Sequence, residues 1–109
     1  MKNDSLLFLW ARLSEIVRGC TGGLEVVVDE PGDLRVETDK GRPFVSVRIQ
    51  RNHVGLYLLP LYYHPDALPP SLSARKSGKG TLRFRDEGDV SIGGLTALVE
   101  SCLALIDHY

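Results

Sequence analysis

The sequence predicts an α+β protein, a two-layer sandwich in which an N-terminal and a C-terminal helix pack on one face of a five-stranded, mainly antiparallel sheet. Apolar residues recur at helical spacing near each end of the chain, and five segments between them alternate apolar and polar residues at the period of a strand. Turn-forming residues separate the first four of these segments, which favours antiparallel neighbours. The expected order of elements is α-β-β-β-β-β-α, and the opposite face of the sheet should be exposed.

The first helix is predicted over residues 4–18. Asp4 or Ser5 has the side-chain chemistry of an N-cap, and Gly19 is typical of a helix end. The apolar residues of this segment fall on one face at the i, i+3, i+4, i+7 spacing: Leu6, Leu9, Trp10, Leu13, Ile16 and Val17. This face should cover the sheet.

Two strands are predicted next, at residues 24–29 and 34–39. A turn with the sequence Glu-Pro-Gly-Asp separates them at residues 30–33. The side chains expected to face the core from the two strands are Leu24, Val26, Val28, Leu34, Val36 and Thr38.

The third and fourth strands are predicted to form a hairpin whose two-residue turn is Arg51-Asn52. The third strand covers residues 43–50, and Pro60 ends or bends the fourth. In this register every inward pair is aliphatic: Ile49 with Val54, Val47 with Leu56, and Val45 with Leu58. The outward side chains are then Phe44, Ser46 and Arg48 on the third strand and Gly55 and Tyr57 on the fourth.

The remaining elements are a connection, a fifth strand and a final helix. Residues 61–73 are rich in proline and serine, which predicts a loop with at most one or two short helical turns. The fifth strand, at residues 81–85, places Leu82 and Phe84 inward and Arg83 and Arg85 outward. The final helix should begin between residues 91 and 93, with one apolar face made of Leu95, Leu98, Val99, Cys102, Leu105 and Ile106.

Composition limits the function more than it identifies it. The chain has 109 residues with 13 basic and 14 acidic side chains, so we expect one domain over residues 1–109 and no global attraction to nucleic acid or to a membrane surface. The charged N-terminal segment does not resemble a signal peptide, which favours the cytoplasm. Cys20 and Cys102 belong to no metal-binding or redox spacing, and we expect no metal and no cofactor.

The stretch RKSGKGTLRFR, at residues 75–85, has glycine and lysine spacing that suggests a phosphate-binding loop. Such a loop opens a helix, whose free backbone N–H groups point at the anion. The glycines here precede a strand, so the pattern argues against a nucleotide loop. The segment is interpreted instead as a solvated entry to the fifth strand, with Lys76 or Lys79 available to an anion.

Two segments of the second half of the chain have recognisable motifs: HVGLYLLPLYYHP at residues 53–65 and KSGKGTLRF at residues 76–84, followed by an amphipathic segment. Through these residues the second half of the chain resembles the YdhG-like domain family of small bacterial proteins. The resemblance implies a small α+β fold with helices on an antiparallel sheet and, for one branch of the family, a frataxin-like iron chaperone. Iron would require Asp, Glu and His clusters. The nearest carboxylates lie in two turns, at Asp29, Glu30 and Asp33 and at Asp86, Glu87 and Asp89.

No catalytic constellation emerges, so the leading hypothesis is a non-enzymatic binding or protein-interaction module that uses the exposed face of the sheet. Its partner would be a small anionic ligand, another protein or a second copy of the chain in a homodimer. The alternative is a carrier of iron or of a small ligand that uses His53, His64 and nearby carboxylates. An enzyme around His64 and Lys79 would lack a nucleophile. The candidate binding residues are Arg48, Tyr57, Lys79, Arg83, Arg85 and His64.

Overall fold

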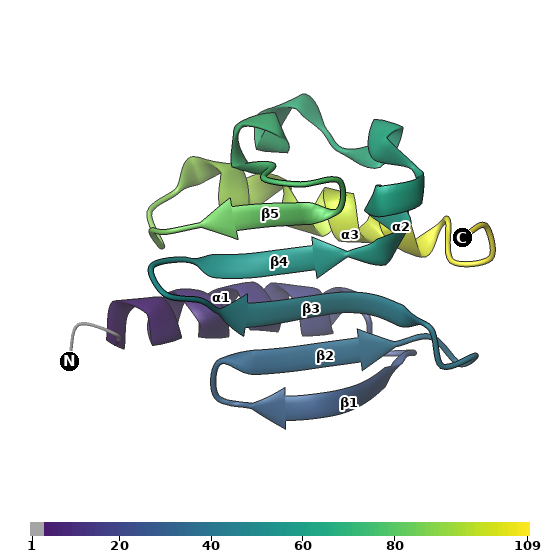
Figure 1. The fold of residues 1–109 in the computed structure, drawn as a ribbon, viewed down its shortest axis with the longest axis horizontal. Coiled ribbons are helices and arrows are strands. Elements are labelled where there is room, and N and C mark those ends of the chain that lie inside the picture. The colour runs from purple at the N-terminus through teal and green to yellow at the C-terminus, as the bar shows by residue number, and fades with distance from the viewer. Residues whose placement is uncertain (1–3) are drawn as a thin grey trace.

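The two end helices and the five strands have the predicted arrangement. The computed structural model describes residues 4–109, and its strands form one antiparallel sheet in the order β1-β2-β3-β4-β5. Helices α1 and α3 lie behind one face of this sheet, and the opposite face, called the outer face below, is turned toward the viewer in Figure 1. The elements are α1 (Asp4–Cys20), β1 (Glu25–Glu30), β2 (Asp33–Glu37), β3 (Pro43–Ile49), β4 (Val54–Leu58), β5 (Thr81–Phe84) and α3 (Leu95–Leu103).

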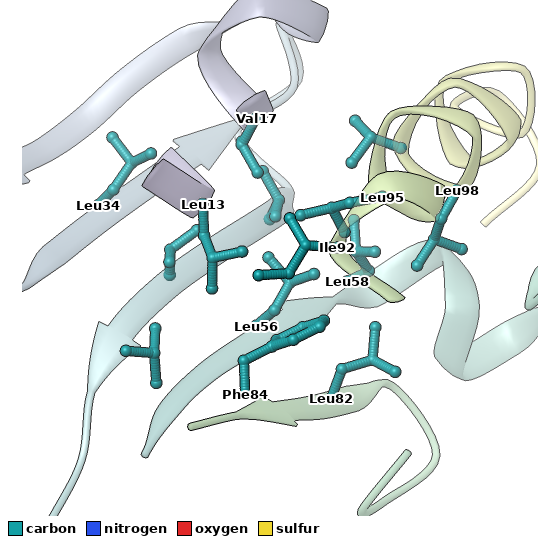
Figure 2. Close-up of a cluster of buried hydrophobic side chains, with 14 of the residues drawn as sticks. Leu13, Val17, Leu34, Leu56, Leu58, Leu82, Phe84, Ile92, Leu95 and Leu98 are labelled. Atoms are coloured by element: carbon teal, nitrogen blue, oxygen red, sulfur yellow. The ribbon is translucent and has the colours of Figure 1, made fainter. Parts of the chain in front are cut away.

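The hydrophobic core fills the layer between the two helices and the sheet. Figure 2 shows Leu13 and Val17 of α1 approaching the same region as Leu56 of β4 and Leu95 of α3. Trp10 adds a polar link, because its indole Nε1–H donates to the Val47 carbonyl of β3 at 2.7 Å. The predicted helix face is therefore the buried face.

The β3–β4 hairpin has the predicted register. Val45 pairs with Leu58, Val47 with Leu56, and Ile49 with Val54. The Gln50 amide donates to the His53 carbonyl at 2.8 Å, which closes the turn at Arg51 and Asn52. Because side chains alternate along each strand, this register also places Ser46 beside Tyr57 and Arg48 beside Gly55 on the outer face.

The predicted outward orientation of Phe44 is wrong. Val36 pairs with Val45 and Glu37 pairs with Pro43, so that Phe44 is an extra residue in the ladder. A bulge of this kind lets two successive side chains turn to the same face. Phe44 and Val45 are accordingly both buried, with relative exposures of 0% and 2%.

Strand β1 is an edge strand, and its predicted core residues are only partly covered. The pairing with β2 shifts between Val26 and Val28, which again marks a bulge. Leu24 and Val28 are half-buried, whereas Val26 and Val27 are 40% and 41% exposed. Only β2 pairs with β1 among the described residues, and β1 carries acidic side chains at Glu25, Asp29 and Glu30. Charges of this kind disfavour edge-to-edge association.

The connection after β4 holds more helix than predicted. It forms three short helical segments in succession: α2 (Leu59–Tyr63), η1 (Pro65–Ala67) and η2 (Pro70–Arg75). Each segment has a proline in its first turn, where the missing N–H costs no hydrogen bond. Leu61 and Leu72 are buried and attach the connection to the core.

The ends of the two long helices differ from the predicted ends by a few residues. Asp4, Ser5 and Gly19 all lie inside α1, which ends at Cys20. A short helix, η3 (Val90–Gly94), precedes α3, and the Asp89 carboxylate caps η3 by accepting from the Ser91 amide at 2.9 Å. Within residues 4–109, no helix has both the length and the apolar character needed to cross a membrane.

Candidate functional site

The strand register arranges the side chains of the outer face in two rows. The first row contains Asp33, Arg48, Gly55 and Arg83, and the second contains Arg35, Ser46, Tyr57 and Thr81. Neighbouring strands lie about 4.8 Å apart, so the backbones at Arg48 and Arg83 are about 10 Å apart on either side of Gly55. Glycine leaves a gap between the two arginine side chains, and the Gln50 side chain borders this gap.

A shallow groove of about 280 Å³ crosses the outer face between β2 and β4. We call it the tyrosine groove, and its lining includes Arg35, Glu37, Ser46, Arg48 and Tyr57. Burial raises the pKa of the Tyr57 hydroxyl, and the neighbouring hydroxyls of Tyr62 and Tyr63 raise it further. Tyr57 therefore presents a neutral hydroxyl, which can both donate and accept a hydrogen bond at neutral pH.

The cations of the tyrosine groove are partly compensated by one carboxylate. The Asp33 carboxylate accepts hydrogen bonds of 3.0 and 3.1 Å from the Arg35 guanidinium. Its Oδ1 atom also lies 3.6 Å from Nε of Arg48. The single carboxylate of Asp33 thus forms ion pairs with both arginines.

A second groove, of about 240 Å³, lies beside β5 and is lined by Ala74, Arg75, Lys76, Ser77, Arg83 and Arg85. We call it the basic groove. The chain reverses direction at residues 77–80, where the Ser77 amide donates to the Thr81 carbonyl at 2.9 Å and Lys76 forms an antiparallel bridge with Leu82. This reversal brings the basic pair at residues 75 and 76 alongside the basic pair at residues 83 and 85.

Among the cations of the basic groove, Arg75 alone has a carboxylate within 4.0 Å in the described part of the chain. Nε of Arg75 lies 2.8 Å from Oδ2 of Asp89, as an ion pair without hydrogen-bond geometry. Hydrogen bonds from Ser91 hold the pKa of the Asp89 carboxyl below its usual value, and Arg75 adds to this effect. Among residues 4–109, no carboxylate lies within 4.0 Å of the Arg83 or Arg85 guanidinium.

His53 lies close enough to Arg83 and Arg85 for their positive charges to affect its pKa. The β4–β5 register pairs Val54 with Phe84, so His53 and Arg85 are the next residues outward on the two strands. Burial lowers the pKa of the His53 imidazole, and the charges of Arg83 and Arg85 lower it further. The positive charges of Arg83 and Arg85 therefore disfavour the protonated form of His53.

The predicted binding residues do not form one cluster. Arg48 and Tyr57 line the tyrosine groove, whereas Arg83 and Arg85 line the basic groove. Nζ of Lys79 lies 5.4 Å from the centre of the Tyr62 ring, and Nε2 of His64 lies 2.9 Å from the His108 carbonyl oxygen. The structure thus places neither Lys79 nor His64 in the lining of the two grooves.

The sequence interpretation did not include Arg75 in the site, and it considered Lys76 only as one of two lysines available to an anion. Arg75 and Lys76 end a connection that has no strand or helix period, so no face could be assigned to them. The sequence does indicate this arrangement, because two basic residues before a glycine-containing turn and two after it lie side by side if the turn joins antiparallel segments.

Carboxylates of the two turns considered for iron form ion pairs with arginines. Residues 4–109 contain no group of three or more His, Cys, Asp or Glu side chains that could hold a metal ion. Asp29 forms an ion pair with Arg18, and Asp33 and Asp89 pair with the arginines named above. Three of the turn carboxylates therefore already have basic partners.

Comparison of the chain with models of protein families, with curated proteins and with solved structures yields no match. The resemblance to the YdhG-like family therefore stays a prediction.

Gly80 holds the turn of the basic groove against β4. Its carbonyl accepts from the Leu58 amide at 2.8 Å, and a Cβ atom at this position would lie 2.8 Å from the Leu58 oxygen and 3.3 Å from Cε1 of Tyr57. We expect Gly80→Ala to lower the free energy of unfolding by about 1–3 kcal/mol, because backbone must move to admit the methyl group.

The matched control is Gly78→Ala in the same turn. Its Cβ atom would approach nothing closer than 3.7 Å, and we expect a change within about 0.5 kcal/mol. Urea unfolding of both variants provides the measurement. Equal midpoints would show that the turn does not pack on β4 as described.

Proposed function

We propose that this chain is a non-enzymatic binding module that holds an anionic partner against the outer face of its sheet. The observation that carries the proposal is the basic groove. Four cationic side chains gather there, and Arg83 and Arg85 have no carboxylate partner within residues 4–109. Because the chain as a whole carries a net charge of −1, this concentration of positive charge is local.

The chemistry of these residues suits recognition of an anion. An arginine guanidinium can donate two parallel hydrogen bonds to a carboxylate or to a phosphate group. The gap over Gly55 and the neutral Tyr57 hydroxyl extend the same surface across β4 toward Arg48. A partner in the basic groove would therefore find further polar contacts on the outer face.

A second copy of the chain fits this face less well than an anionic ligand does. A two-fold symmetric contact brings the same patch of each copy together. The outer face carries Arg35, Arg48 and Arg83 against Asp33 and Glu37, so self-association would place arginines near arginines. Light scattering distinguishes the two occupants, since a dimer that Tyr57→Ala dissociates would favour the homodimer.

The proposal also includes the cellular compartment and the protein family. Cys20 and Cys102 are both free, which suits a reducing compartment such as the cytoplasm. Membership of the YdhG-like family agrees with the α+β fold, in which two helices cover one face of an antiparallel sheet.

Fluorescence anisotropy with a labelled hexaglutamate peptide tests the proposed function. The peptide supplies repeated carboxylates without a defined sequence, so it reports on charge recognition alone. We expect saturable binding at low ionic strength that weakens as salt is added, because the contacts are exposed ion pairs. Absence of binding at millimolar peptide in low salt would contradict the proposal.

A further inference from the structure

We propose that the basic groove is a site for the phosphate group of a phosphorylated ligand. This inference rests on the proposed function and deepens it by naming the chemical class that the groove selects. The groove residues that carry the argument are Arg75, Lys76, Ser77, Arg83 and Arg85.

The groove offers cations from two sides. Arg83 lies on β5 and Arg85 is the first residue after this strand, and both point outward about 7 Å apart, because alternate residues of an extended chain share a face. Arg75 and Lys76 approach from the antiparallel segment on the other side of the groove. A single carboxylate is matched by one guanidinium fork, whereas a phosphate group has oxygens in three directions and can accept from several donors at once.

Part of the groove is already held in place. Asp89 accepts from the Ser91 amide at 2.9 Å and from the Ser91 hydroxyl at 2.6 Å, and its other oxygen pairs with Arg75. The Arg75 side chain is therefore restrained before any ligand arrives, which lowers the entropy cost of binding. Asp86, the first carboxylate after Arg85, accepts from the Gly88 amide at 3.0 Å.

The site differs from a glycine-rich nucleotide loop. Gly78 and Gly80 do not open a helix, and Gly80 is buried against β4. Side chains, rather than the backbone at a helix N-terminus, would supply most of the donors. This difference explains why the pattern at residues 75–85 resembles a phosphate loop only in composition.

His53 provides a reporter within the same cluster. The charged groups that act on its imidazole are Arg83 of β5 and Arg85 just after β5, and on its own hairpin Nδ1 lies 3.2 Å from the Asn52 side-chain oxygen. An anion bound between the two arginines would offset their charge. Binding should therefore raise the pKa of His53 toward its ordinary value.

The test is a titration of the ¹⁵N-labelled protein with inorganic phosphate and with O-phosphoserine, followed by NMR, with acetate at equal ionic strength as the control. We expect saturable shifts of the Ser77 and Arg83 amides, a rise in the His53 pKa, and no saturation with acetate. Arg83→Gln should weaken phosphate binding by about tenfold. Arg18→Gln, which removes a cation next to Asp29, should leave it unchanged.

Each outcome decides a separate point. Tighter binding of O-phosphoserine supports a phosphorylated molecule as the ligand, and equal binding supports free phosphate in the same site. Saturation by acetate at the same concentration would overturn the selectivity for phosphate. If hexaglutamate binds while phosphate does not, this inference is wrong and the proposed function stands, whereas failure of both probes contradicts both. Lys76→Gln repeats the test if Arg83→Gln does not fold.

Discussion

Replacing Phe44 with alanine is expected to lower the free energy of unfolding by about 3–5 kcal/mol, a large part of the 5–15 kcal/mol typical of a domain. Phe44 is fully buried and is among the largest side chains of the core. Truncation removes its apolar contacts and leaves a cavity that the neighbouring strands can only partly close. Urea unfolding at equilibrium measures the loss.

Phe8→Ala is the matched control for this prediction. The Phe8 side chain is 61% exposed on α1, and we expect its truncation to cost less than about 1 kcal/mol. If the two variants unfolded at the same urea concentration, Phe44 would lie on the outer face, as simple alternation predicts. The bulge opposite Val36 and Glu37 would then be wrong.

The second large effect concerns binding. The double variant Arg83→Gln, Arg85→Gln is expected to weaken the affinity for hexaglutamate by about 10- to 100-fold. Hydrogen bonds to charged groups contribute about 1.5–3 kcal/mol each, and exposure to solvent reduces this contribution. Anisotropy titrations at moderate salt, about 0.1 M, give the ratio of dissociation constants.

A control double variant with the same change in net charge distinguishes the loss of contacts in the basic groove from the loss of overall positive charge. Arg18→Gln with Lys40→Gln removes two cations, one from α1 and one from the turn between β2 and β3. Its affinity should stay within about twofold of the original at moderate salt, because screening limits exposed charges to about 10 Å. Equal losses in the two double variants would assign the binding to net charge.

Much of the fold could be predicted because local periodicity agrees with the tertiary arrangement. The β3–β4 register follows from three aliphatic pairs, and any slip by one residue would have turned Val47 or Leu56 toward water. Phe44 could not be placed in this way. Its orientation depends on where the β2–β3 ladder absorbs an extra residue, which is a property of two strands and their turn.

The candidate site could be predicted only where it lies on regular strands. Arg48, Tyr57 and Arg83 face outward because their neighbours are core residues. Arg75 is the last residue of the third of three short helical segments, so its position depends on how that connection folds back on β5. Lys79 and His64 are close to the site in sequence, but their side chains turn toward Tyr62 and His108.

The most direct test of the central claim, that the outer face with its basic groove is the binding surface, is a map of amide chemical shifts during titration with hexaglutamate. We expect the largest shifts on residues 75–77, 83 and 85, with smaller ones at Arg48 and Gly55. Shifts concentrated on α1, on α3 or on the β1 edge would contradict it.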